Sequence, residues 1–362
     1  MTLEVVVVRS FTSRAAGPYE RGLEFGTAHA RDIAGTVTGY RMMFDGLAEA
    51  PVPIAEPGAR AFTAIEKWAP DLAREIEGMA AGAGLPVEDL AAINARTEIL
   101  ATLPAPPRGE CSAAVVLGEP TRAGQTWDWA EAMAGNWFVW TIPHPSGHVV
   151  RTMTEYGIVG KIGVSSANVG VLFTFLSHAR DGETMGVPVH VVARRVLDEA
   201  RDLSSATGLL ISPEVSASTS VTVVTPGSAI TAELHPGGPA WVLPDDDGVL
   251  VHTNHFLDPV AAAGDQVPRE YPDTLLRHQT LRRRLRSGGP LTEAMADHSS
   301  GSKSICCHVP PGAVLPEWEQ RTLATIELHV ERGDLTVHAG GPCGVRPVSP
   351  SGELSSGAGA SS

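Results

Sequence analysis

Apolar residues in roughly the first 105 positions recur mostly at steps of three and four, the spacing that places them on one face of a helix. The clearest amphipathic helix is predicted over residues 61–84, and residues 19–44 show a less regular helical spacing that Gly22, Gly26 and Gly35 interrupt. A further helix is predicted over residues 85–100, and the proline-rich stretch 104–107 closes this section. The short apolar run at residues 1–9 is predicted to be a strand.

From Cys111 onward, short apolar runs separated by glycine-rich turns predict strands in place of helices. Residues 111–117 and 126–129 form a predicted hairpin around the turn at 118–124. Further strands are predicted at 149–155, 157–164, 170–176, 219–225, 229–234, 248–252, 322–330 and 334–339, and helices at 189–210, 274–286 and 291–298. Such segregation of helices and strands favours an α+β sandwich in which helices cover two antiparallel sheets. The Ser/Gly/Ala-rich tail 349–362 is predicted to be disordered.

Composition favours a large globular domain and argues against a nucleic-acid binder. The chain has 362 residues and 43% hydrophobic residues, enough for one large sandwich or a domain with a pro-segment. A formal net charge of −14 argues against a general nucleic-acid binder, which needs a basic face. The one basic cluster follows the leucines of a predicted helix and is interpreted as a solvated helix face, with a local anion or coenzyme-phosphate contact as the alternative. It consists of Arg277, Arg282, Arg283, Arg284 and Arg286.

The cysteines and the apolar runs predict a cytoplasmic protein. Four cysteines are present without a CxxC pair, which argues against a disulfide framework or a zinc ribbon and fits a reducing cytosol. The run at residues 1–9 carries an early acidic residue and is not typical of a signal peptide. The longest uncharged apolar stretch, 162–177, has glycine and turn residues in its middle, which predicts two strands rather than a membrane span.

Two histidine and cysteine groups raise the question of a metal. His252 and His255 are three residues apart on an extended segment, so their side chains point in different directions, and no metal is expected there. Cys306, Cys307 and His308 lie at a strand end, where the small thiols are predicted to be packing residues. No metal site is therefore predicted.

Cys111 is the residue with the clearest chemical potential. It follows a Pro/Gly-rich break and precedes an apolar run, so a loop is predicted before it and a buried strand after it. If the Glu110–Cys111 bond were cut, Cys111 would carry a thiol and an α-amine, which together supply a nucleophile and its base. A core cysteine is the alternative interpretation of the residue taken by itself.

Several segments in a fixed order resemble one known family. They are residues 75–84 (EIEGMAAGAG), 90–100 with Asn94 to Glu98, Cys111-Ser112, 124–129 (GQTWDW), 154–163 (TEYGIVGKIG), Gly170-Val171, 252–256 (HTNHF), 304–306 (SIC) and Arg321-Thr322. The chain resembles the acyl-coenzyme A:isopenicillin N acyltransferase family of N-terminal nucleophile hydrolases, over about Tyr19 to Pro342.

The resemblance implies an αββα four-layer fold and self-cleavage between Glu110 and Cys111. Residues 1–110 would form a helical pro-segment, the α chain, and residues 111–348 the catalytic β chain, and the two would remain associated within one integrated fold. Attack of the thiol on the Glu110 carbonyl gives a thioester that water resolves, after which the α-amine accepts the thiol proton. Glu110 is a departure, because the family often has a small residue there.

The resemblance also assigns roles to individual positions. Asp128 would orient the nucleophile and the new amine, and Asn254 would donate its amide N–H to the oxyanion. Arg321 would hold a carboxylate or order the site, although Gln320 before it departs from the antibiotic-making relative, which has serine there. The structural alternatives are a turn cap for Asp128, a turn former for Asn254 and a surface charge for Arg321.

Substrate contacts are predicted for Lys161, Trp127 and His255, with a pairing of Lys161 to Glu155 as an equal alternative. The expected function is acyl transfer from an amide or an acyl-coenzyme A to water or an amine, without a cofactor, since coenzyme A would enter as part of a substrate. High Gly, Ala and Arg usage is typical of high-GC bacteria, where such enzymes often serve specialised metabolism.

Two other function classes stay open. An uncleaved binding protein with the same fold is favoured only by Glu110. A papain-like Cys/His peptidase needs a helix that begins at the cysteine and a partner histidine, whereas Cys111 precedes a β-rich run.

Overall fold

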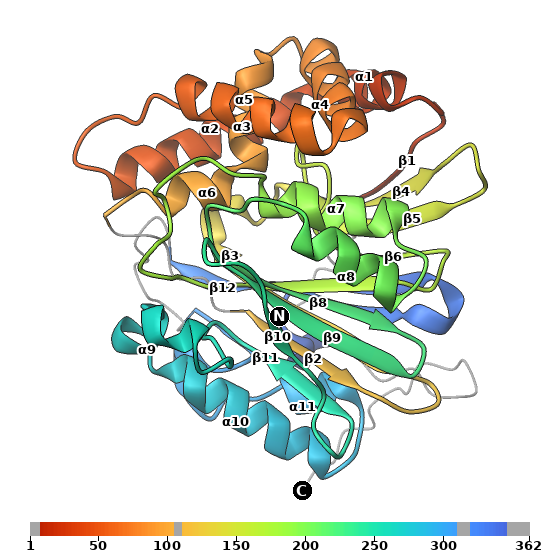
Figure 1. Cartoon of the computed structure of the whole chain (residues 1–362), viewed down its shortest axis with the longest axis vertical. Helices are drawn as coiled ribbons and strands as arrows, with labels where there is room; N and C mark the ends of the chain where they lie inside the picture. The colour runs from red at the N-terminus through yellow and green to blue at the C-terminus, as the bar shows by residue number, and fades with distance from the viewer. Residues whose placement is uncertain (1–7, 105–110, 310–318, 346–362) are drawn as a thin grey trace, which may run out of the picture.

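Two β-sheets lie face to face between helical layers in the computed structural model, which describes residues 8–104, 111–309 and 319–345 (Figure 1). The red, orange and green helices cover the larger sheet, and the teal and blue helices cover the smaller one (Figure 1). This arrangement confirms the predicted α+β four-layer sandwich. Glu110, most of the predicted strand at 1–9 and the tail 349–362 lie outside the described residues.

In the part of the chain that the structure describes, the larger sheet has eight strands in the order β1-β4-β5-β6-β7-β8-β9-β10. They are β1 (Ser10–Thr12), β4 (Trp137–Pro143), β5 (Val149–Glu155), β6 (Ile162–Ser165), β7 (Gly170–Phe175), β8 (Thr219–Thr225), β9 (Ser228–Leu234) and β10 (Ala240–Val242). Among the described strands, all neighbours are antiparallel except β1 and β4, which are parallel and contradict the prediction of antiparallel sheets at this edge. β5 and β8 have the predicted bounds, whereas β4 and β10 were not predicted.

The smaller sheet has five strands within the described ranges, in the order β11-β2-β3-β12-β13. They are β2 (Ser112–Val116), β3 (Arg122–Ala130), β11 (Val249–His252), β12 (Gln320–His329) and β13 (Asp334–Ala339). The predicted hairpin is confirmed, since β2 and β3 pair antiparallel. The Gln125 side chain of β3 links the two sheets, because its Nε2 donates to the Phe173 carbonyl at 2.5 Å and its Oε1 accepts from the Phe173 N–H at 3.0 Å.

Six helices lie in the described residues before Cys111. They are α1 (Pro18–Ala28), α2 (Ala30–Leu47), α3 (Ala55–Trp68), α4 (Pro70–Ala83), α5 (Val87–Asn94) and α6 (Arg96–Leu100). The single helix predicted over residues 61–84 is two helices, because Pro70 has no N–H to continue the first and instead begins the second. Residues 189–210 likewise form α7 (Val189–Glu199) and α8 (Leu203–Ile211), since Asp202 caps the second helix.

Two of the glycines that interrupt the predicted helical pattern, Gly22 and Gly26, lie at the contact between α1 and α4. A Cβ atom on Gly22 would lie 2.0 Å from the Glu75 carbonyl oxygen, and one on Gly78 would lie 2.1 Å from the Tyr19 carbonyl oxygen. Gly26 and Gly82 are almost as close to the facing backbone, where an added Cβ would lie 2.3 Å and 2.5 Å from a carbonyl oxygen. The two helix backbones therefore touch directly, and the glycines are needed for that close approach.

A pair of glycine substitutions tests this contact. Gly78→Ala is expected to destabilise the fold by about 3 kcal/mol, because the added methyl group forces the α1 and α4 backbones apart. Gly35→Ala in α2 is the control and is expected to stabilise by about 0.5–1 kcal/mol, because no atom lies within 4 Å of its added Cβ. Thermal melting measures the stability of both variants. Equal melting midpoints for Gly78→Ala and Gly35→Ala would contradict the close packing of α1 and α4.

Helices α9 (Val267–Glu270), α10 (Asp273–Arg286) and α11 (Leu291–Met295) belong to the layer over the smaller sheet. Alternate residues of β2 face opposite ways: Ala113 and Val115 join the main core, while Ala114 and Val116 pack with residues of α10 and α11. Among the described residues, no helix combines the length and the apolar character that crossing a bilayer requires.

Candidate active site

Cys111 is held at both ends of its backbone. Its N–H donates to Asn254 Oδ1 at 3.0 Å, and its carbonyl oxygen accepts from Arg277 Nη1 at 3.0 Å. The residue is 6% exposed and stands immediately before β2. Because His252 at the end of β11 pairs with Ala113 of β2, the sheet register brings Asn254 beside Cys111. The strand that follows Cys111 excludes the papain-like arrangement, which needs a helix there.

Arg277 connects the residues around the nucleophile. It donates to Asn254 Oδ1 at 3.1 Å and to Ser112 Oγ at 3.3 Å, in addition to the Cys111 carbonyl. Its side chain is buried and pairs with Asp273 one helical turn earlier. The prediction of a solvated helix face is therefore wrong for Arg277, because its guanidinium is turned inward and satisfied by polar partners.

The remainder of the basic cluster fits the predicted surface face. Arg282 and Arg286 are partly exposed and both pair with Asp245. The sequence held a signal that separates Arg277 from the surface arginines. Arg277 precedes Leu281 by four residues and Leu285 by eight, so it shares their face of α10. Both leucines are buried, and a charge on that face needs buried partners.

A small cavity opens beside the Cys111 thiol. Asp128 and Trp127 of β3 line it together with Lys161, and Arg96 lines it from the N-terminal helices. Its other lining residues are Thr97, Leu100, Cys111, Trp129, Phe173, Phe175 and Thr219. The structure therefore brings together four of the predicted residues, Cys111, Trp127, Asp128 and Lys161, and Asn254 contacts Cys111 from outside the cavity lining.

The Cys111 thiol is protonated at neutral pH in this environment. Burial raises its pKa to about 11, and the Asp128 carboxylate adds to this effect. The Asp128 backbone N–H, Lys161 and Arg277 act in the opposite direction but do not outweigh it. A base must therefore remove the thiol proton before Cys111 can act as a nucleophile.

Lys161 forms the predicted pair with Glu155 and also lines the cavity, while its substrate contact stays a prediction. Its Nζ donates to Glu155 Oε2 at 2.7 Å and lies 3.8 Å from the centre of the Trp127 ring at the cavity. Burial lowers the pKa of Lys161 to about 7, although Glu155 opposes that change. Glu155 also accepts from Arg96 at 3.1 Å and from the Tyr40 hydroxyl, so a buried network joins the cavity to the N-terminal helices.

Arg321 and His255 lie apart from the cavity lining in the described part of the chain. Arg321, in β12, forms an ion pair with Glu131 and is partly exposed. His255 contacts Thr274 Oγ1 at 3.0 Å, and burial, followed by the charge of His278, lowers its pKa to about 3. The roles predicted for these two residues stay predictions. His252 pairs with Glu233 at 2.8 Å, so His252 and His255 face different partners.

Comparisons with known proteins agree with the expected family. Residues 118–342 match the family described as acyl-coenzyme A:6-aminopenicillanic acid acyl-transferase. The chain is similar to the acyl-coenzyme A:6-aminopenicillanic-acid-acyltransferase 40 kDa form of Emericella nidulans, with 28% identity over 297 residues that cover 80% of this chain and 82% of the relative. Among solved structures, penicillin V acylase from Agrobacterium tumefaciens matches with a TM-score of 0.43 and 15% identity, over 63% of this chain and 83% of that one.

Proposed function

Because the chain belongs to the acyl-coenzyme A:6-aminopenicillanic acid acyl-transferase family and is therefore an acyl-transfer enzyme, we propose that Cys111 is its nucleophile and that self-cleavage at Glu110–Cys111 activates it. The thiol attacks the Glu110 carbonyl, the peptide bond is replaced by a thioester, and water hydrolyses that thioester. The products are the Glu110 carboxylate, a free thiol and the α-amine of Cys111. Each later turnover forms a thioester between Cys111 and the acyl group of a substrate.

The observation that carries this proposal is the pair of hydrogen bonds that hold the Cys111 backbone. Asn254 Oδ1 accepts from the Cys111 nitrogen at 3.0 Å, so the same atom pair would position the α-amine after cleavage. Arg277 holds the carbonyl on the other side of the residue, and Cys111 is among the residues that line the cavity. An α-amine has an ordinary pKa of about 8, which suits it to remove the thiol proton near neutral pH.

The hydrogen bonds of Asn254 leave one amide proton for the predicted oxyanion role. One of its Nδ2 protons is donated to the Phe175 carbonyl at 3.0 Å, and an amide nitrogen carries two protons. We assign the second Nδ2 proton to the substrate oxyanion, while Oδ1 holds the Cys111 nitrogen. Such a donor typically contributes about 3 kcal/mol to stabilisation of the transition state.

Buried polar contacts across the cleavage boundary support continued association of the two chains. Glu75 of α4 pairs with Arg194 of α7 at 2.8 Å, and both side chains are fully buried. Asn94 Oδ1 accepts from the Val159 N–H at 3.0 Å, and Arg96 pairs with Glu155. Separation of residues 1–110 from the β chain would leave these buried groups without partners, at a cost of several kcal/mol.

The substrate class follows from the family and from the cavity. Its aromatic and aliphatic lining, including Trp127, Phe173 and Phe175, suits the apolar part of an acyl group. The proposed donor is an amide, which releases an amine, or an acyl-coenzyme A, which releases the coenzyme thiol. The acceptor is water or an amine such as 6-aminopenicillanic acid. We place the enzyme in the cytoplasm and in specialised metabolism, with no resident cofactor in the reaction.

Intact-mass spectrometry of the wild-type chain tests this proposal. Two masses that correspond to residues 1–110 and 111–362 are expected, and a short incubation with an acyl-coenzyme A should add one acyl group to the second mass. A single uncut chain that never acquires an acyl group would support the alternative of a non-catalytic binding protein.

Cleavage is expected to accelerate with pH. Since burial and Asp128 raise the pKa of Cys111 to about 11, the thiolate fraction of the uncut chain should grow about tenfold per pH unit between pH 7 and 9. Uncut chain from cell-free synthesis can be followed at several pH values on a denaturing gel. A rate that does not change with pH would mean that a neighbouring group takes the thiol proton.

A further inference from the structure

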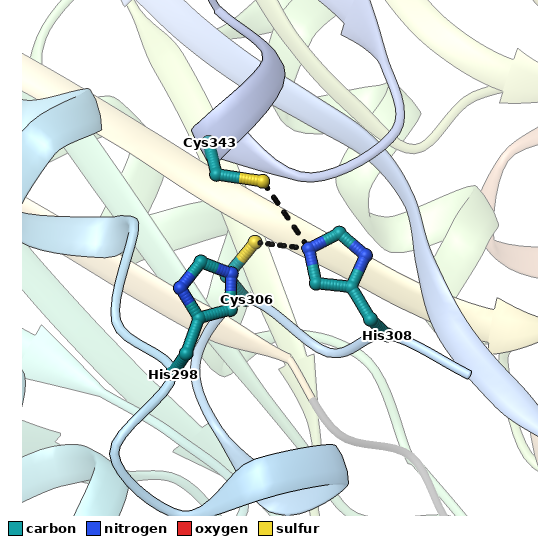
Figure 2. A group of neighbouring side chains, drawn as sticks. All are labelled: His298, Cys306, His308 and Cys343. Atoms are coloured by element: carbon teal, nitrogen blue, oxygen red, sulfur yellow. Dashed lines mark hydrogen bonds between the residues drawn. The ribbon is translucent and has the colours of Figure 1, made fainter. Parts of the chain in front are cut away.

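Four potential metal ligands converge at the edge of the smaller sheet. His298 follows α11, Cys306 and His308 lie on the loop that leads toward β12, and Cys343 belongs to the short helix η5 (Pro342–Gly344) after β13. Figure 2 shows the four side chains gathered from these three stretches of chain. One ligand atom from each residue lies within 4.8 Å of the others, and His308 Nε2 lies 3.2 Å from both sulfur atoms.

We propose that His298, Cys306, His308 and Cys343 form a Cys2His2 site for a zinc ion. Two thiolates and two neutral imidazoles are the donor set that structural zinc sites use, and zinc takes them in tetrahedral geometry. Two thiolate charges also balance the charge of a divalent ion. The proposal concerns a different part of the molecule from Cys111 and does not depend on the proposed function.

The distances suit such an ion. Zinc binds sulfur at about 2.3 Å and imidazole nitrogen at about 2.0–2.1 Å, so neighbouring sulfur and nitrogen ligands of a tetrahedral site are about 3.6 Å apart. The separations here, from 3.2 Å to at most 4.8 Å, lie on both sides of that value. Coordination would therefore need only small side-chain shifts in the three exposed residues, His298, His308 and Cys343.

Gly341 provides independent support because its missing side chain leaves space beside the ligands. A Cβ atom there would lie 2.6 Å from Cys306 Sγ and 3.3 Å from His308 Cε1. Its φ of −71° is open to any residue, so backbone conformation does not demand glycine at this position. The requirement comes from the space around the Cys306 sulfur and the His308 ring.

Adjacent cysteines have different surroundings here. The Cys307 thiol is turned toward the Ser302 carbonyl at 3.1 Å and the Gln320 carbonyl at 3.4 Å, which agrees with the predicted packing role. Cys306 instead faces His308. The expectation that both thiols only pack, and that the chain holds no metal site, is therefore replaced for Cys306 by the proposed zinc site.

The proposed ion would have a structural role. Four protein ligands fill a tetrahedral zinc shell and leave no position for substrate. The Cys306 N–H donates to the Asp297 carbonyl at 3.1 Å, and the Thr322 N–H of β12 donates to the Cys307 carbonyl at 3.0 Å. Zinc would thus fasten the loop at residues 297–308 and η5 to the strand that pairs with β3, where Asp128 lies opposite Thr322.

Metal analysis of the full chain tests the site. Wild-type protein produced with zinc supplementation should retain about one zinc ion per chain after desalting, and Cys306→Ser and Cys343→Ser should each lose most of it. Cys307→Ser is the matched control and should retain zinc, since its hydroxyl can still donate to one of the two carbonyls that the thiol contacts. Cobalt-loaded wild type and Cys307→Ser should show thiolate-to-cobalt absorption, and Cys306→Ser should not.

Stability provides a second readout that does not involve catalysis. A chelator should lower the melting temperature of wild type and of Cys307→Ser by several degrees and leave Cys306→Ser unchanged. Three outcomes would overturn the proposal: metal-free wild type that cobalt does not change, equal zinc in wild type and the Cys306→Ser/Cys343→Ser double variant, or a Cys306–Cys343 disulfide in freshly purified protein. Zinc content should persist in Cys111→Ala, which separates this result from any failure of the proposed nucleophile.

Discussion

Replacement of Cys111 by alanine is expected to give a chain that stays at its full mass and has no measurable acyl-transfer activity. The thiol is the only group proposed to bond to the acyl carbon, so its removal should reduce kcat by at least about 10⁴-fold. The fold should tolerate the change, because the Cys111 N–H and carbonyl make the bonds to Asn254 and Arg277 and both are kept in alanine.

Two further variants sharpen this result. Cys111→Ser should cleave far more slowly than wild type, because a hydroxyl is much less acidic than a thiol. Cys307→Ser should cleave and turn over like wild type, since Cys307 contacts backbone carbonyls away from the cavity lining. A Cys111→Ala chain that still splits at residue 110, or still transfers acyl groups, would assign the nucleophile to another residue.

Replacement of Arg277 by lysine is expected to reduce kcat by about 100-fold with little change in KM. A lysine keeps the buried charge but cannot reach the Cys111 carbonyl, Ser112 Oγ and Asn254 Oδ1 together, as the guanidinium does. Asn254 and Cys111 would then lose their fixed geometry, and misplacement of reacting groups by about 1 Å has effects of this size. Single-turnover acylation of Cys111 is the measurement.

Arg283→Ala is the matched control, because Arg283 is an exposed residue of the same helix. It should leave both acylation and melting temperature close to the wild-type values. If Arg277→Lys acylated as fast as this control, Arg277 would serve folding and not the position of the nucleophile. Loss of activity that only follows loss of folded protein, measured by melting, would lead to the same conclusion.

The predicted elements show what local sequence could and could not provide. The β2–β3 hairpin followed from short apolar runs on both sides of a glycine-containing turn, and β5 and β8 were bounded correctly because turn residues flank them. Long helices were predicted where Pro70 and Asp202 begin new ones, since the apolar spacing continues across each break. The strand β4 was missed although it lies between two neighbours, pairing parallel with β1 and antiparallel with β5.

For the site residues too, local motifs could be predicted from sequence and contacts between distant segments could not. Cys111, Asp128 and Asn254 stand in local motifs, and the pairing of β2 with β3 and β11 brings them together. Arg277 was missed because its partners are distant in sequence and only the packing of α10 on β2 and β11 reveals them. Cys343 could not be connected to His308 from sequence, since 34 residues and two strands separate them.

The buried ion pair between Glu75 and Arg194 joins two halves of the fold that the proposed cleavage would turn into separate polypeptides. Before the cut, the two halves meet as parts of one chain, at the high effective concentration of an intramolecular encounter. After the cut, a denatured enzyme would have to reassemble from two separate polypeptides, at a rate that depends on their concentration. Mature protein should therefore recover poorly from denaturation when dilute, whereas the uncut Cys111→Ala chain should refold. Folding is thus expected to precede cleavage, because the charges that must be buried together are still on one chain at that point.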